Sequence, residues 1–304
     1  MSDSENNWPP GGEEQLPASA NEPTSSPALP QPVEAGAPFS AAPNPASAAI
    51  PDDLHTVWGW PDLVLFVLFA LGSSVVLPLL VGLAAVLLWH VKPADIDKAP
   101  QVKAMVILIG QALWSAGVIA YMYGTVRLRS GAPFWHAVGW RELRPLRLTR
   151  SAAAGACLLG GVGLAVAVQL SSLAVGKKTT LPIEELFRSR QSVLMLMALG
   201  ILVAPLVEET IFRGYIYPVL ARGIGIPAGI VITGALFGML HAPQLWGGWG
   251  QIALIMLVGV VLTAVRARTG TVVASYLVHL TYNTMLFVEF FFATGGLRHF
   301  PTSS

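Results

Sequence analysis

Residues 203–213 read VAPLVEETIFR, and this stretch decides how the rest of the chain is interpreted. Two adjacent carboxylates, Glu208 and Glu209, and the guanidinium of Arg213 follow directly on a long apolar run. A single Asp, Lys or Arg at the centre of a bilayer costs about 2.5 to 3.5 kcal/mol on insertion scales. Charged residues in such a run therefore indicate a functional site within a membrane.

The composition on either side of this stretch is typical of a polytopic membrane protein. Of the 304 residues, 54% are hydrophobic and 12% are charged, whereas soluble domains carry about 25% charged residues. The net charge of +1 gives no indication of a nucleic-acid partner. We expect an all-α bundle of about seven to eight transmembrane helices, because each span needs about 17 to 25 mostly apolar residues. The apolar runs cover approximately residues 62–89, 102–126, 151–175, the stretch from 192 onward, 226–241, 251–265 and 271–292.

The N-terminal part of the chain has a different composition. Residues 1–55 contain no Lys or Arg and no apolar segment, and they are rich in Pro, Ala, Ser and Glu. Such a segment buries too little apolar surface to offset its ordering entropy, so we expect a disordered, acidic tail. We expect the first transmembrane helices within residues 56–190, a functional core of the same bundle at 191–293, and a short C-terminal tail at 294–304.

Helical spacing separates the two members of the acidic pair. Glu209 and Arg213 are four residues apart with the acid on the N-terminal side, which is the favourable order for an ion pair on a helix. Glu208 lies about 100° further around the helix and is left free to face another span. Because an unpaired carboxylate in apolar surroundings is costly, we expect Glu208 to have a role of its own.

Two further polar groups occur in later spans, and helix lengths predict their depth. One is Phe237 with His241, and the other is His279 with Asn283, which share one helical face. If one long helix runs from about residue 192 to 221, Glu208 and His241 each lie about 24 Å from the turn between their helices. The distance from His279 to the turn that precedes its own helix is about 11 Å shorter than this. We therefore expect Glu208 and His241 to be level and His279 to be shallower.

These side chains suit the hydrolysis of an acyl bond. A desolvated carboxylate can act as a general base toward water, and a histidine can share that water or protonate the leaving amine. A second histidine and an amide can donate to a developing oxyanion. Alternatively, Glu208, His241 and His279 are a known type of ligand set for catalytic zinc, although no His-Glu-x-x-His motif requires the metal. Each group alone would more often only bond across helices, so the inference rests on their combination.

Taken in order, the three groups resemble one protease family. Glu-Glu-x-x-x-Arg at 208–213, Phe-x-x-x-His at 237–241 and His-x-x-x-Asn at 279–283 are similar to the motifs of the CPBP intramembrane proteases. This family includes type II CAAX prenyl endopeptidases, bacteriocin-processing proteins and lysostaphin-resistance-like proteins. The similar region covers about residues 194–290.

The resemblance implies a role for each matching residue. Glu208 would activate water with His241 beside it, and His279 and Asn283 would stabilise the oxyanion. The supporting residues would be Glu209, Arg213 and Phe237. No cofactor is favoured, because no additional cluster of ligands is present in the sequence, and zinc held by Glu208, His241 and His279 is the alternative.

The resemblance implies an intramembrane endopeptidase that cleaves a membrane-associated peptide or protein in a lipid bilayer, such as the inner membrane of a bacterium. The substrate does not transfer, because members of the family act on very different substrates. The sequence leaves two alternative functions open. One is a non-catalytic immunity or regulatory scaffold of the same fold, and the other is a transporter that relays protons through buried Glu and His. The full set of polar groups disfavours the scaffold, and the lack of a paired half-repeat disfavours many transporter folds.

Overall fold

The computed structural model describes residues 51–90, 92, 100–143, 149–175 and 190–298, and within these ranges the regular structure is helical, without strands. This confirms the predicted all-α class. The helices that stand alone are α1 (Trp60–Trp89), α3 (Pro100–Ser130), the short α4 (Phe134–Ala137), α5 (Arg150–Val175), α9 (Ile226–Leu240), α10 (Trp249–Thr269) and α11 (Val272–Ala293).

The fourth apolar run forms one continuous composite helix. It consists of α6 (Arg190–Ala198), a π-helical segment (Leu199–Val203), α7 (Ala204–Glu209), a second π-helical segment (Thr210–Ile216) and α8 (Tyr217–Ile224). The prediction of a single long helix through the acidic pair is thereby confirmed, because the apolar part alone extends from Val193 to Ile224.

All seven predicted apolar runs are helices, but they differ in length and polarity. Five stretches are long and apolar enough to cross a membrane, judged by length and composition: Trp60–Leu88, Met105–Ser130, Arg150–Ala174, Val193–Ile224 and Trp249–Thr269. Helix α9 is shorter, with 15 residues, or about 22 Å at 1.5 Å per residue. Helix α11 is not among the five, and it carries the polar residues His279, Asn283 and Glu289.

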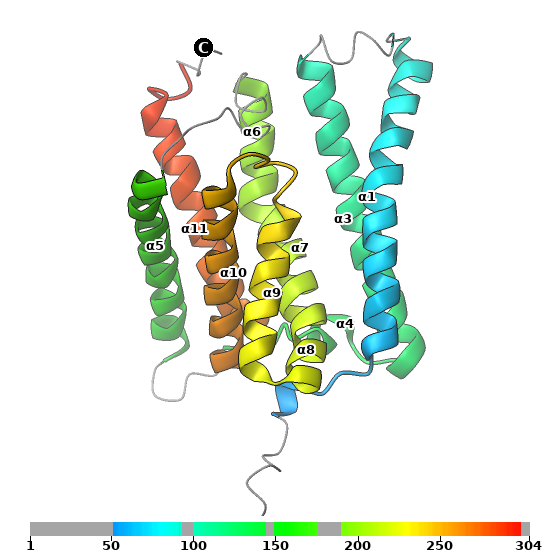
Figure 1. The fold of residues 1–304 in the computed structure, drawn as a ribbon, viewed down its shortest axis with the longest axis vertical. Helices are drawn as coiled ribbons and strands as arrows, with labels where there is room; N and C mark the ends of the chain where they lie inside the picture. The colour runs from blue at the N-terminus through cyan, green and yellow to red at the C-terminus, as the bar shows by residue number, and fades with distance from the viewer. Residues whose placement is uncertain (1–50, 91, 93–99, 144–148, 176–189, 299–304) are drawn as a thin grey trace, which may run out of the picture. The chain divides into compact units, whose positions relative to one another are not determined.

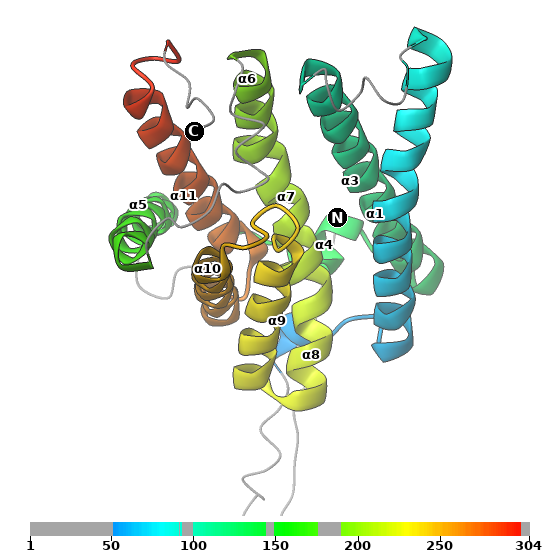
Figure 2. The ribbon, with the colours of Figure 1, turned by 45° about the horizontal axis from the view of Figure 1, so that its top comes forward.

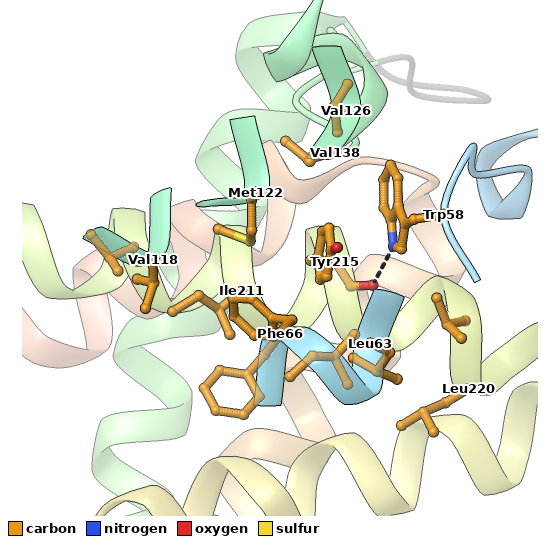
Figure 3. Packing of buried hydrophobic residues seen from close by; sticks show 14 of the residues in the cluster. Trp58, Leu63, Phe66, Val118, Met122, Val126, Val138, Ile211, Tyr215 and Leu220 are labelled. Carbon is orange, nitrogen blue, oxygen red and sulfur yellow. Dashed lines mark hydrogen bonds between the residues drawn. The ribbon is translucent and has the colours of Figure 1, made fainter. Parts of the chain in front are cut away.

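The helices pack in neighbouring pairs. Helix α1 lies along α3, α5 lies along α11, and α9 lies between α8 and α10 (Figures 1 and 2). A cluster of buried side chains joins α1 and α3 to the composite helix (Figure 3). At its centre the ring of Tyr215 stacks on Trp58 at 4.8 Å between centroids and contacts Phe66 at 5.0 Å.

Helices α9 and α10 approach each other backbone to backbone. A Cβ atom added to Gly234 would lie 2.5 Å from the backbone nitrogen of Val260, and one added to Gly259 would lie 2.7 Å from the carbonyl oxygen of Gly234. Small residues at helix contacts are common in membrane proteins, because they let the backbones come close. The contact brings the backbone of α10 near the composite helix at the level of Arg213, whose guanidinium reaches the Gly259 carbonyl.

The structure describes only the end of the predicted N-terminal tail. Most of the predicted tail, residues 1–50, lies outside the described residues. The end of the tail, however, forms a 3-10 turn at Asp52–Leu54, and Leu54 is buried. The sequence misses this because a Pro-Asp-Asp stretch looks like solvated tail, while its partner Arg266 is 213 residues away.

The structure also describes part of the predicted C-terminal tail. Residues 294–298 of the predicted tail 294–304 continue α11 as a turn, with Thr294 and Leu297 buried. The hydroxyl of Thr294 accepts a hydrogen bond from the Leu297 backbone nitrogen at 3.2 Å, which closes this turn.

Candidate active site

The acidic pair lies on the short segment α7, between the two π-helical segments of the composite helix. A π-helical turn inserts an extra residue into the helix, and such turns are frequent at functional sites. Pro205 near the start of α7 has no backbone N–H and contributes to the local change of hydrogen-bond pattern.

Glu209 and Arg213 form the predicted i,i+4 ion pair in full burial. The distance from Arg213 Nη1 to Glu209 Oε1 is 2.9 Å, and both side chains have no exposed surface. Arg213 also donates from Nη2 to the Gly259 carbonyl at 2.8 Å and from Nε to the Thr263 hydroxyl at 3.2 Å. Its guanidinium carbon lies 4.6 Å from the centroid of the Phe237 ring. The charge is therefore held by four different groups from three helices.

Glu208 stands outside this ion pair and lies between the two histidines. Its Oε1 is 4.0 Å from His241 Nε2, and its Oε2 is 3.7 Å from His279 Nε2. Both distances are longer than a direct hydrogen bond. The side chain retains 17% exposure, whereas that of Glu209 has none, so Glu208 is the carboxylate that a ligand can reach.

Both histidines are oriented by their Nδ1 atoms. His241 follows α9 directly, and its Nδ1 lies 2.9 Å from the carbonyl oxygen of Phe237. Because a carbonyl can only accept, His241 Nδ1 carries the hydrogen. His279 Nδ1 lies 3.0 Å from Glu209 Oε1. In each ring the other nitrogen, Nε2, is thereby turned toward Glu208.

The buried ring of Phe237 fills the space between these groups. Its centroid lies 4.9 Å from that of His241, 5.6 Å from that of His279 and 5.3 Å from that of Phe212. The predicted supporting position of Phe237 thus corresponds to a packing centre that touches both imidazoles.

The depth predicted for His279 is wrong. Glu208 and His241 are level, as expected, but His279 contacts both carboxylates instead of lying about 11 Å away. The count assumed parallel helices with their turns at one height, whereas α11 is inclined to α9 (Figures 1 and 2). All three of Glu208, His241 and His279 therefore lie at one depth.

Asn283 lies one turn beyond His279 on α11, and its amide is directed elsewhere. Its Nδ2 donates to the carbonyl oxygen of Gly200, in the first π-helical segment, at 2.7 Å. The structure therefore brings Glu208, His241 and His279 together and places Asn283 against a different part of the composite helix.

Two supporting residues on α10, Gly259 and Thr263, were missed by the sequence reasoning. The Thr263 hydroxyl donates to the Gly259 carbonyl at 2.7 Å, and both groups accept from Arg213. A glycine followed four residues later by a threonine in an apolar span is a weak signal, because hydroxyls in helices commonly bond to their own backbone. Only the close contact of α9 and α10 gives the pair its partner.

The arrangement of Glu208, His241 and His279 differs from that of a metal site. Zinc needs its ligand atoms within about 2.0 to 2.2 Å of one point. Among the residues that the structure describes, no group of three or more His, Cys, Asp or Glu side chains is arranged to hold an ion. The three side chains as placed do not fit a zinc site.

Part of the chain is similar to a known protein family. The family model of the Rce1-like type II CAAX prenyl endopeptidases matches residues 190–285, about a third of the chain. No curated protein and no solved structure matches the chain. The matched region contains all of the side chains described above. The segment 190–285 is thus similar to the Rce1-like type II CAAX prenyl endopeptidase family, which confirms the resemblance predicted from the three motifs.

Proposed function

We propose that this integral membrane protein is an endopeptidase that hydrolyses a peptide bond of a membrane-associated peptide or protein, with water activated by Glu208. The observation that carries the proposal is the position of Glu208, which is outside the Arg213 ion pair and faces the Nε2 atoms of two histidines. The family match and the five candidate spans support a protease in a cell membrane, such as the inner membrane of a bacterium.

The gap between Glu208 and His241 has the size of one water molecule. A water oxygen about 2.8 Å from each of two acceptors 4.0 Å apart sees them at an angle of about 90°, close to its own H–O–H angle. With its hydrogen on Nδ1, neutral His241 offers a lone pair at Nε2. A water held here would donate one hydrogen to Glu208 and the other to His241, leaving an oxygen lone pair for attack.

Every proton and every bond of the reaction can then be accounted for with these residues and water. Glu208 removes a proton as the water oxygen bonds to the substrate carbonyl carbon, and the C=O electron pair moves to the oxygen. When the C–N bond breaks, the proton passes from Glu208 to the leaving nitrogen, directly or through His241. The products are a carboxylic acid and an amine. Proton transfer by a positioned side chain typically contributes about 10²- to 10⁴-fold in rate.

We assign the stabilisation of the oxyanion to His279. Glu208 and Glu209 together carry two negative charges, of which Arg213 balances one. A proton on both nitrogens of His279 balances the other, and its Nε2–H then becomes a donor on the side of the attacked carbonyl. Glu209 fixes the orientation of this ring through Nδ1, and Arg213 fixes Glu209.

Glu208→Gln tests the assignment of the base. The change conserves volume and leaves the buried Glu209–Arg213 ion pair intact, so we expect cleavage to fall by about 10²-fold or more while the thermal unfolding midpoint stays within a few degrees. The assay uses purified protein in liposomes that display a peptide library. Glu289→Gln is the matched control, because Glu289 is a carboxylate on α11 that bonds Gln169 outside the site.

The two possible failures of this test have different meanings. Full activity in Glu208→Gln would show that another group is the base. A wild-type protein that cleaves no peptide in the library, although it is folded and inserted, would instead favour a non-catalytic scaffold.

A further inference from the structure

The hydrogen-bond pattern before α7 leaves one carbonyl without its backbone donor. In the first π-helical segment the N–H of Ala204 bonds to the carbonyl of Leu199, five residues earlier. In this register the next donor, at position 205, would bond to the carbonyl of Gly200. Position 205 is a proline, which has no N–H.

A carbonyl freed in this way must find another donor. Within a membrane no bulk water is available, and an unsatisfied backbone group costs several kcal/mol. Neighbouring helices are the usual source of the replacement bond when proline interrupts a transmembrane helix. Here the donor is Asn283, whose Nδ2 lies 2.7 Å from the Gly200 oxygen.

The same carbonyl lies at a close contact between the composite helix and α11. A Cβ atom added to Gly200 would lie 3.1 Å from Cε2 of Phe287, one turn beyond Asn283. Two successive turns of α11 therefore meet the π-helical segment at Gly200, one by a hydrogen bond and one by packing. His279 lies one turn before Asn283 on the same face of α11.

We propose that Asn283 is a positioning residue that replaces the backbone donor missing at Pro205, and that it thereby fixes α11 and His279 against the helix that carries Glu208. The test below measures both the unfolding midpoint and cleavage, and its cleavage measurement rests on the proposed function. An Asn283 that served the oxyanion would be needed whatever residue occupies position 205. An Asn283 that satisfies Gly200 becomes dispensable once position 205 has an N–H.

The experiment is a double-mutant cycle of Asn283→Ala and Pro205→Ala in the full chain. Asn283→Ala alone should lower the unfolding midpoint by about 2 to 4 °C, the shift for one net hydrogen bond in a protein of this size, and should lower cleavage by about 100-fold. In the Pro205→Ala background a backbone N–H reaches Gly200. In that background, Asn283→Ala should lower the midpoint by less than half as much. The cleavage rate of the double variant should stay within about threefold of that of Pro205→Ala alone.

Pro218→Ala is the matched control, because Pro218 follows the second π-helical segment near the start of α8 and its replacement restores an N–H far from Gly200. It should not rescue Asn283→Ala. Equal losses of midpoint and of cleavage from Asn283→Ala in the wild-type and Pro205→Ala backgrounds would overturn the proposal.

The role of Asn283 can still be tested if the wild type is inactive or if Pro205→Ala does not fold. If no peptide is cleaved even by the wild type, the midpoint cycle still decides the role of Asn283, independently of the proposed function. If Pro205→Ala gives no folded protein, Asn283→Leu decides. A lost positioning bond lowers both midpoint and cleavage, whereas a lost oxyanion donor lowers cleavage alone.

Discussion

Arg213 is the residue on which the buried part of the site depends. It is fully buried and interacts with Glu209, Gly259, Thr263 and the ring of Phe237. Removing one partner of a buried ion pair typically costs about 3 to 5 kcal/mol, because the other charge is left without compensation. The planar guanidinium uses three separate nitrogens here, and the single ammonium of lysine cannot reproduce that fork.

We expect Arg213→Ala to lower folded yield and thermal stability as well as cleavage, and Arg213→Lys to recover only part of the loss. Folded yield after size-exclusion chromatography and the unfolding midpoint are the measurements. Arg268→Ala is the control, because Arg268 is exposed in the last turn of α10. A stable, fully active Arg213→Ala protein would contradict a buried ion pair at this position.

Thr263 offers a finer test at the residue scale. Its hydroxyl accepts from Arg213 and donates to Gly259, and Thr263→Val would leave the buried Arg213 Nε without an acceptor. Such an unsatisfied group costs about 1 to 3 kcal/mol, so the midpoint should fall in Thr263→Val and recover in Thr263→Ser. Thr269→Val, an exposed change on the same helix, should be neutral. Equal midpoints for the Val and Ser variants at 263 would refute the contact.

At the scale of helices, α11 is held on its outer side by α5. A Cβ atom added to Gly161 would lie 2.5 Å from the carbonyl oxygen of Val278, next to His279, and 2.6 Å from Cβ of Thr281. Both neighbours are backbone or rigid, so α11 itself would have to move. Overpacking of this kind costs about 1 to 3 kcal/mol.

We expect Gly161→Ala to lower the cleavage rate by displacing His279, and to lower the unfolding midpoint through the overpacking. Gly163→Ala on the same helix is the control, because nothing lies within 4 Å of a Cβ added there. The measurement is the cleavage rate of both variants at matched protein concentration. If the two variants behave alike, the position of α11 does not depend on this contact.

The helices could be predicted from the sequence, but their inclinations could not. Apolar runs and the i,i+4 spacing were sufficient to place Glu209 with Arg213 and to set Glu208 level with His241. The depth of His279 was wrong because it follows from the inclination of α11, which side-chain packing determines. The bond from Asn283 to Gly200 was not predictable either, because it depends on a π-helical register that residue periodicity does not reveal.

For the molecule as a whole, the metal content of the purified chain is a direct test. The proposed water is held by Glu208 and His241 without a metal, so we expect cleavage to persist in an excess of a strong chelator. Elemental analysis and the cleavage rate are the measurements. One zinc per chain, lost together with activity in His279→Ala, would show that the imidazoles bind a metal ion.

The segment from Asp52 to Trp58 has a consequence for how the protein is made. Asp53 Oδ2 lies 2.5 Å from Nη1 of the buried Arg266, and Trp58 Nε1 donates to the carbonyl of Tyr215. A ribosome adds about 5 to 20 residues per second, so Arg266 is synthesised roughly 10 to 40 s after Asp53. During that time α1 can enter the membrane, but Asp53 has no Arg266 to bind. These residues, among the first that the structure describes, are therefore among the last to reach their final position.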